Sequence, residues 1–364
     1  MFQLLLLLLQ HPNRVVTRDE LVDAVWQGRF ISDSAVSARI AAARKAVGDT
    51  GKDQKVIRTV HGTGVMLVPK VEIGDAAHNL QPVSYQTDDI QRIRFTRNEH
   101  GQRLAFSVTG SGSPVMAMGV LLTRDIHHEW ENQPERRLID AVRARHRLLR
   151  FDNLGSGQSD RVPVEISFGA IADEAKLVAE AAGFERFAMY SESGGALPAI
   201  HFAAKYPEML EKLVIIGGYA EGRSLRAQRQ RPELMRALIE EGWNEPLGAF
   251  ATAFMTTYFP EGPLESVHEL VDMMQKSCSP ETMLKLRDAI NEASVLHLLQ
   301  RVQCPTLIIH SRNDAVHPLT QAQKLAAGIP NSELVVLDSA NHVPLPGNAV
   351  WDCFLASFLD FLED

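Results

Sequence analysis

The sequence predicts an α/β protein: a mostly parallel sheet with helices on both faces, preceded by a small helical domain that ends in a β-hairpin. From Ile90 onward, short apolar runs alternate with amphipathic stretches, as expected of buried strands joined by crossover helices. Before that point, helical periodicities give way to two β-type runs on either side of a turn. At 364 residues, the chain is long enough for both domains.

Composition and charge narrow the class of protein. The net charge is −8, yet residues 1–70 hold ten Lys and Arg against six Asp and Glu, so a basic head precedes an acidic body. A basic head is compatible with nucleic-acid binding. Three scattered cysteines favour a reducing, cytoplasmic setting, and neither a metal site nor another cofactor is expected. The leucine run at residues 4–9 is too short to span a membrane, so it predicts a core helix and no membrane association.

The head, residues 1–68, predicts three helices followed by a hairpin. Thr17 and Glu20 have the spacing of a capping box at the start of the second helix. Asp33 or Ser34 caps the third helix, whose apolar positions recur on one face at Val36, Ile40, Ala43 and Val47. The runs 55–60 and 65–68 flank the turn 61–64. Three helices and a terminal hairpin form a winged helix.

The head resembles the OmpR/PhoB-type winged-helix DNA-binding domain. The resemblance rests on the segments Val15-Val16-Thr17-Arg18-Asp19-Glu20-Leu21, Val25-Trp26, Ser32-Asp33-Ser34-Ala35-Val36, Arg44-Lys45-Ala46-Val47-Gly48-Asp49 and Ile57-Arg58-Thr59-Val60-His61-Gly62-Thr63-Gly64. It implies that the helix from Ser34 to Val47 enters the major groove of double-stranded DNA and that the hairpin contacts the backbone or minor groove. The candidate DNA contacts are Arg39, Arg44, Lys45, Arg58 and His61. A three-helix interaction module that does not bind DNA is the alternative.

Three departures from that family bear on DNA affinity, one of which is that the hairpin lacks the arginine and the aromatic residue that usually follow its glycines. The chain starts inside the first helix of the family pattern, so the head is expected to be incomplete at its N-terminus. Ala41 and Ala42 stand where the family often has basic residues. Fewer cations release fewer counterions, and weak DNA binding is therefore expected. A homodimer on paired half-sites is the assembly that such regulators often form.

Residues 69–89 lack periodicity and are rich in Pro, Gly, Asn and Asp, which predicts an interdomain linker. The body, residues 90–364, then shows seven strand-like runs, at 104–108, 115–118, 147–151, 187–190, 213–216, 306–309 and 334–337. From about residue 219 to 299 the rhythm is broken by a helical stretch rich in Met, Phe and Leu. This stretch predicts a helical cap inserted into the α/β domain.

Polar residues that follow the apolar runs are candidates for catalysis, because in such sheets catalytic groups lie at the carboxyl ends of strands. Ser193 follows one run and is flanked by the small residues Ser191 and Gly195, as a tight strand-to-helix elbow requires. Alone, this string also fits an ordinary glycine-rich turn. Asp314 and His342 follow two later runs. Serine, then acid, then histidine is the chain order of a nucleophile elbow with its orienting acid and its base.

The body resembles the α/β-hydrolase family from about residue 90 to 362. The resemblance rests on Phe151-Asp152-Asn153-Leu154-Gly155-Ser156-Gly157-Gln158-Ser159-Asp160, the elbow, the segment 305–318 and Ser339-Ala340-Asn341-His342-Val343. It implies that Ser193 is the nucleophile, His342 the base and Asp314 the residue that orients the base. It also implies an oxyanion hole formed by the backbone N–H of Gly194 and that of Val120 or Leu121.

Other residues are candidates for the substrate pocket. The segment Arg124-Asp125-Ile126-His127-His128-Glu129-Trp130 resembles hydrolase modules fused to bacterial regulators. We expect Gly119, His127 and His128 to line the pocket, with helix-cap or surface histidines as the alternative for the last two. His317 is expected at the pocket rim or on the surface. Phe254 and Tyr258 of the cap should face the ligand, and an apolar cap favours an acyl, aryl or lactone-like molecule.

Two functions follow from these motifs. The first is a DNA-binding transcriptional regulator fused to a serine hydrolase that acts on a small apolar ester, thioester or lactone. The second is a ligand-sensing transcription factor without turnover, in which the hydrolase pocket is the effector site and ligand binding shifts the DNA affinity of the head.

Overall fold

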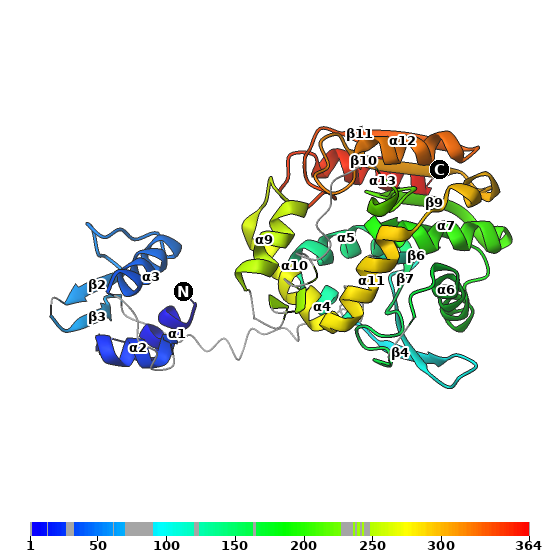
Figure 1. Ribbon diagram of the computed structural model, residues 1–364. Coiled ribbons are helices and arrows are strands. Elements are labelled where there is room, and N and C mark those ends of the chain that lie inside the picture. The colour runs from blue at the N-terminus through cyan, green and yellow to red at the C-terminus, as the bar shows by residue number, and fades with distance from the viewer. Residues whose placement is uncertain are drawn as a thin grey trace. The chain divides into compact units, whose positions relative to one another are not determined.

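The computed structural model describes residues 2–12, 14–26, 33–60, 62–69, 90–119, 124–162, 165–226, 236, 239–240, 242–243 and 248–363. The chain divides into two compact units, residues 1–84 and 85–364 (Figure 1). Apart from Pro69, the predicted linker 69–89 lies outside the described residues. Within the described part of the chain, every helix is too short or too polar to span a membrane.

The head contains the helices and the hairpin that its sequence predicts. The helices are α1 (Phe2–Gln10), α2 (Arg18–Trp26) and α3 (Asp33–Ala46), and the hairpin is formed by β2 (Ile57–Val60) and β3 (Gly64–Leu67). A third strand, β1 (Val15–Thr17), pairs antiparallel with β3, giving the sheet order β1-β3-β2. Three residues are too few to show an alternating pattern, so β1 could not be predicted from the sequence.

Local chemistry explains the boundaries of the head's helices. The Thr17 N–H donates to a Glu20 carboxylate oxygen at 2.8 Å and the Glu20 N–H donates to Thr17 Oγ1 at 3.3 Å, so the predicted capping box forms. Leu4 and Leu8 of the leucine run are fully buried, whereas Leu6 and Leu9 are exposed. Val47 was expected on the buried apolar face of the third helix, and this prediction was wrong. The helix α3 ends at Ala46, and Val47 is exposed.

The body is built on one eight-stranded sheet with the order β11-β10-β9-β8-β6-β7-β5-β4. All seven predicted runs are strands: β5 (Arg103–Thr109), β6 (Ser113–Gly119), β7 (His146–Phe151), β8 (Phe187–Glu192), β9 (Leu210–Ile216), β10 (Thr306–Ser311) and β11 (Ser332–Leu337). The eighth, β4 (Ile93–Arg97), carries charged residues and has no apolar run, so it was missed. The pairs β4–β5 and β5–β7 are antiparallel and the other pairs are parallel.

Helices cover both faces of this sheet, as the alternating sequence pattern predicts. Along β6, Met116 and Met118 face one core and Val115 and Ala117 face the other. The first core is completed by α6 (Phe168–Ala182), α7 (Ala196–Lys205) and α12 (Leu319–Gly328). The second is completed by α5 (Gln133–Arg143) and α13 (Trp351–Glu363). Burial on both faces explains why the strands are continuous apolar runs.

A helical cap is inserted between β9 and β10. It contains α9 (Ala249–Tyr258), α10 (Leu264–Ser277) and α11 (Pro280–Glu292), which Figure 1 shows together along one side of the sheet. Two backbone hydrogen bonds close the base of this insertion: the Gly222 N–H donates to the Ala293 carbonyl at 2.7 Å, and the Val295 N–H to the Ala220 carbonyl at 3.0 Å. The short helices η5 (Arg223–Leu225) and η6 (Leu296–Arg301) flank this closure.

Candidate active site and DNA-binding surface

Ser193 occupies a strained elbow between β8 and α7. Its backbone φ is +52°, in the left-handed region that non-glycine residues rarely adopt. A Cβ atom on Gly195 would lie 1.8 Å from the carbonyl oxygen of Gly119, at the end of β6. The small residue two positions after Ser193 is therefore required by the close approach of the neighbouring strand.

The structure brings together the three residues that the sequence predicts as a triad. His342 Nε2 lies 2.7 Å from Ser193 Oγ, and His342 Nδ1 lies 2.7 Å from Asp314 Oδ2. With the Nδ1–H donated to the carboxylate, Nε2 is an acceptor that faces the serine hydroxyl. This is the geometry required for a general base to take the proton of a nucleophile.

Asp314 is buried and held by its own loop. Its second carboxylate oxygen, Oδ1, accepts the backbone N–H of Val316 at 2.7 Å and that of His317 at 3.1 Å. These two bonds leave Oδ2 directed at His342. A carboxylate fixed in this way selects one tautomer of the imidazole and one orientation of the ring.

His317 does not lie at the pocket rim or on the surface, as the sequence led us to expect. It is buried, its ring stacks on that of Tyr219 at a centroid distance of 4.0 Å, and it lies 5.3 Å from the ring of His342. Its backbone N–H donates to Asp314 Oδ1 at 3.1 Å and its Nδ1 lies 3.0 Å from the Arg226 guanidinium, so both its backbone and its ring have partners inside the protein. Burial lowers the pKa of His317 well below its usual range, so this ring is neutral beside His342.

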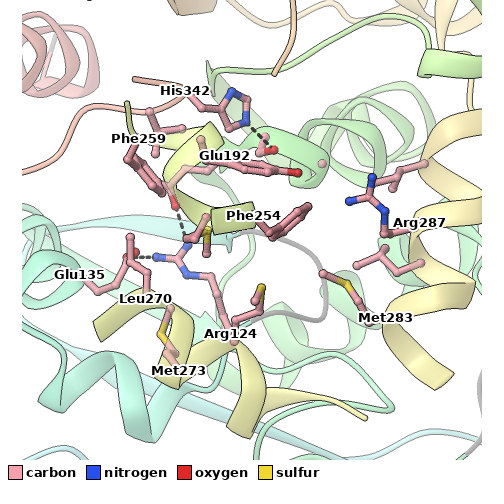
Figure 2. Close-up of a pocket in the computed structure, with 18 residues that line it drawn as sticks. Arg124, Glu135, Glu192, Phe254, Phe259, Leu270, Met273, Met283, Arg287 and His342 are labelled. Carbon is pink, nitrogen blue, oxygen red and sulfur yellow. Dashed lines mark hydrogen bonds and ion pairs between the residues drawn. The ribbon is translucent and has the colours of Figure 1, made fainter. Parts of the chain in front are cut away.

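Ser193 and His342 open onto a cavity roofed by the cap. Its empty volume is about 880 Å³, counting the part open to solvent. Phe254 and Tyr258 line it, as the sequence predicts, together with Gly194 and apolar residues from α9, α10 and α11 (Figure 2). The Tyr258 carbonyl accepts the His342 N–H at 2.7 Å, so the cap is tied directly to the loop that carries the base.

Three other pocket predictions are wrong among the described residues. Gly119, His127 and His128 do not line the cavity. The backbone N–H groups of His127 and His128 donate to Asp125, which caps α4 (Ile126–Glu131); the His127 side chain is exposed, and His128 Nδ1 lies 3.0 Å from Asp125 Oδ2. The alternative of helix-cap or surface histidines therefore describes them: both lie in the first turn of α4, next to its cap, and His127 is on the surface. Val120 and Leu121, the predicted second oxyanion donors, lie outside the described residues.

Below the elbow lies a buried charge cluster that the sequence did not reveal. The guanidinium of Arg124 pairs with the carboxylates of Glu129, Glu135 and Glu192, and Arg150 pairs with Glu129 at 2.7 Å. Burial raises the pKa of Glu135 to about 7. Arg124, Glu135 and Glu192 also line the cavity. The one signal in the sequence is that Glu192 directly precedes Ser193. The other members of the cluster are far from Ser193 in the chain, so the sequence does not connect them with the elbow.

The head presents only some of the predicted DNA contacts to solvent. Arg39, Lys45 and Arg58 are exposed. Arg44 is buried, and its guanidinium donates to the Ile57 carbonyl at 2.8 and 2.9 Å and to Thr59 Oγ1 at 2.9 Å. The prediction that Arg44 contacts DNA is therefore wrong. Its guanidinium is buried and forms hydrogen bonds between α3 and the hairpin. His61 lies outside the described residues.

Comparison with known proteins adds two family matches. Residues 1–67 match the family described as transcriptional regulatory protein, C terminal, and residues 124–349 match the family described as alpha/beta hydrolase fold.

Individual relatives match the body. RutD of Klebsiella pneumoniae strain 342, which bears the provisional name carbamate hydrolase, is 27% identical over 207 residues, or 56% of this chain and 76% of that protein. A 2-hydroxy-6-oxononadienedioate/2-hydroxy-6-oxononatrienedioate hydrolase of a Pseudomonas species is 30% identical over 218 residues, or 57% and 74%. The crystal structure of a hydrolase from Pseudomonas aeruginosa PA01 superposes with a TM-score of 0.62 at 22% identity, covering 75% of this chain and 99% of that one.

Proposed function

The chain belongs to the alpha/beta hydrolase fold family and carries a transcriptional-regulator C-terminal domain at its head, and from this premise we propose that its body is a serine hydrolase. In this proposal Ser193 is the nucleophile, His342 the base and Asp314 the orienting acid. The observation that carries it is the unbroken hydrogen-bonded chain from the Ser193 hydroxyl through His342 to Asp314, with 2.7 Å at each step.

The proposed reaction is acyl transfer in two halves. Ser193 Oγ attacks the carbonyl carbon while His342 Nε2 takes the hydroxyl proton, and Asp314 stabilises the imidazolium that results. The negative charge on the carbonyl oxygen is stabilised by the Gly194 N–H and by a second N–H from Val120 or Leu121. As the bond from the acyl carbon to the leaving oxygen or sulfur breaks, His342 gives its proton to that atom, which becomes an alcohol or a thiol. A water molecule, deprotonated by the same imidazole, hydrolyses the acyl-enzyme and restores the Ser193 hydroxyl.

The cavity supports a small substrate with an apolar body. Phe254, Met255, Leu270, Met274, Leu286 and Ile290 contribute apolar side chains to its wall. Burial of apolar ligand surface against such a wall is favourable, at about 25 cal/mol per Å². We therefore propose an ester, thioester or lactone with an alkyl or aryl group as the substrate class.

The head is proposed to bind double-stranded DNA through α3 and the hairpin. Arg39, Lys45 and Arg58 are exposed on these elements, and His61 is retained from the sequence prediction. Because the head belongs to a regulator family, a second function is that the pocket senses a ligand without turnover and controls DNA affinity. The observation that favours it is the fusion itself. Assembly as a homodimer on paired half-sites is part of the same proposal.

Labelling with a fluorophosphonate probe tests the hydrolase proposal. Wild-type protein should be labelled covalently, and Ser193→Ala and His342→Ala should not. p-Nitrophenyl esters of increasing chain length then report turnover and acyl preference. Absence of both labelling and ester hydrolysis in the wild type would refute the hydrolase. If an apolar ligand still raised the Tm, the sensor function would remain.

A further inference from the structure

Arg287 is a buried cation that faces the cavity and has no anionic partner in the part of the chain that the structure describes. It lies in the middle of α11, is 8% exposed and lines the cavity together with Ser193 and His342. Its guanidinium lies 5.3 Å from the centre of the Phe254 ring. Among the described residues, no hydrogen bond or ion pair involves this guanidinium. This distinguishes Arg287 from Arg124, which is bonded to three carboxylates.

This arrangement leaves the charge and the donors of Arg287 available to a ligand in the cavity. A charged group removed from water is disfavoured when its charge and its donors are not compensated. The face of Phe254 attracts the cation but accepts none of its five N–H groups in a hydrogen bond of ordinary strength. An anion inside the cavity would compensate both the charge and the donors of Arg287.

The two charged regions of the cavity fix where that anion lies. At one side, Arg124 is already bonded to three carboxylates, so it is less available to an anionic ligand than Arg287. Figure 2 shows Arg287 across the cavity from Arg124 and Glu135, with its guanidinium directed inward and with Phe254 and Met283 nearby. An anionic ligand is therefore steered toward Arg287, and its apolar part lies against the residues between the two regions.

We propose that Arg287 binds a carboxylate of the substrate, so that the substrate class is a carboxylate-bearing ester, thioester or lactone. The reaction part of this inference rests on the proposed function, whereas the binding part does not. A planar guanidinium matches a carboxylate in bidentate geometry. Among the described lining residues, Arg287 is the single arginine without a carboxylate partner, and one such cation fits a monoanion better than a phosphate dianion.

The first test measures binding without catalysis. In the Ser193→Ala background, the Tm is recorded with phenylacetate and with phenylacetamide, which differ in charge but hardly in shape. Phenylacetate should raise the Tm more than phenylacetamide does. Arg287→Met should remove this difference and Arg287→Lys should keep part of it, which separates loss of the cation from loss of the fold. Equal stabilisation by both compounds, or a difference that persists in Arg287→Met, would overturn the inference.

The second test measures specificity. Mono-p-nitrophenyl glutarate and p-nitrophenyl valerate differ only by a carboxylate in place of a terminal methyl. The ratio of their kcat/KM values should fall roughly 10- to 100-fold in Arg287→Met, the size expected for a lost charged hydrogen bond. Lys285→Met, on the same helix but outside the cavity lining, should leave the ratio unchanged. An unchanged ratio in Arg287→Met refutes the substrate class even where ester turnover shows that the hydrolase is active.

The two proposals fail in different ways. If the wild-type protein neither reacts with the fluorophosphonate nor cleaves esters, the hydrolase proposal is refuted. Arg287-dependent binding of phenylacetate by that protein would still support a carboxylate site. If the enzyme is active but shows no Arg287-dependent preference for carboxylates, the hydrolase proposal stands and the proposal of a carboxylate site is rejected.

Discussion

Nη1 of Arg124 lies 2.6 Å from a carboxylate oxygen of Glu192, the residue that precedes Ser193. This ion pair joins the elbow to the residue that directly follows segment 120–123. The proposed second oxyanion donor, Val120 or Leu121, belongs to that segment. Glu129 and Glu135 bind the same guanidinium, and Arg150 supplies a second cation at Glu129, so Arg124 is bonded to three buried carboxylates of which it shares one. Arg124 is in this view a positioning residue for the elbow.

Replacing Arg124 by Met should destabilise the body, because three carboxylates would lose a buried counter-charge. We expect the free energy of unfolding to fall by roughly 3–5 kcal/mol, measured by urea denaturation. Lys276→Met is the control, since its exposed i,i+4 pair with Asp272 should contribute no more than about 0.5 kcal/mol. If the two variants unfold at the same urea concentration, the cluster does not support the elbow.

Asp314→Asn should disable the base while preserving the fold. The amide that replaces Oδ2 would donate rather than accept, so His342 would carry its proton on Nε2 and could not accept the Ser193 proton. We expect kcat to fall by roughly 10⁴-fold near neutral pH, the loss that a wrong tautomer causes in serine proteases. Asp338→Asn, at an exposed site on a neighbouring loop, is the matched control. An Asp314→Asn enzyme with near-normal kcat would show that Asp314 is not needed to orient His342.

The sequence predicted the strands, and it singled out the three residues that the structure brings into one hydrogen-bonded chain, because each prediction depends on local pattern and chain order. Seven apolar runs became strands, and Ser193, Asp314 and His342 follow three of them. The strand β4 escaped prediction because it lies at the sheet edge and carries charge where buried strands carry apolar residues.

The rest of the site depends on contacts between residues far apart in the chain. Arg124 and Glu192 are 68 positions apart, and neither has a local motif that points to the other. Arg44 fits the family pattern for a DNA contact, yet its hydrogen bonds to Ile57 and Thr59 turn it inward. His317 could be placed only once the direction of the Asp314 loop was known.

Glu174 should make the stability of the body depend on pH. Burial raises its pKa from 4.5 to about 7, so between these values the folded protein holds a proton that the unfolded chain releases. The contribution of the Glu174 carboxyl to the free energy of unfolding is fully present below about pH 4.5. It is lost as the pH rises through about 7. Relative to Glu174→Gln, the wild type should lose about 1–2 kcal/mol over this window, since the side chain is only partly shielded from water. Urea unfolding at several pH values measures this difference, and parallel curves for the two proteins would contradict it.

Lys45 should contribute to DNA affinity through its charge, because it is exposed at the end of α3. In the full-length protein, Lys45→Met should weaken binding to duplex DNA at low salt. The slope of log K against log salt should become shallower by about one, as expected when one phosphate contact is lost. Fluorescence anisotropy with a labelled duplex measures both quantities.

Arg44→Met is the matched variant on the same helix. It should lower the stability of the head by roughly 1–3 kcal/mol, because the buried Ile57 carbonyl loses its donor. If Lys45→Met left the affinity and the salt slope unchanged, α3 would not be the DNA-binding helix of this chain.

Gly195→Ala should disrupt the elbow by steric conflict alone. The backbone conformation at Gly195, with φ of −61°, accommodates alanine, but the added Cβ would lie 1.8 Å from the Gly119 carbonyl oxygen and 3.0 Å from its carbon. Both are backbone atoms at the end of β6, a strand paired on each side within the sheet, and cannot move aside cheaply. We expect a loss of roughly 3 kcal/mol in the free energy of unfolding and loss of fluorophosphonate labelling.

Gly169→Ala, in α6, is the control, because the added Cβ would meet atoms only at 3.8 Å and beyond. The stability of this variant should be unchanged or raised by up to about 1 kcal/mol. Wild-type labelling and stability in Gly195→Ala would mean that β6 and the elbow can separate without cost, and the requirement for a small residue after Ser193 would need another cause.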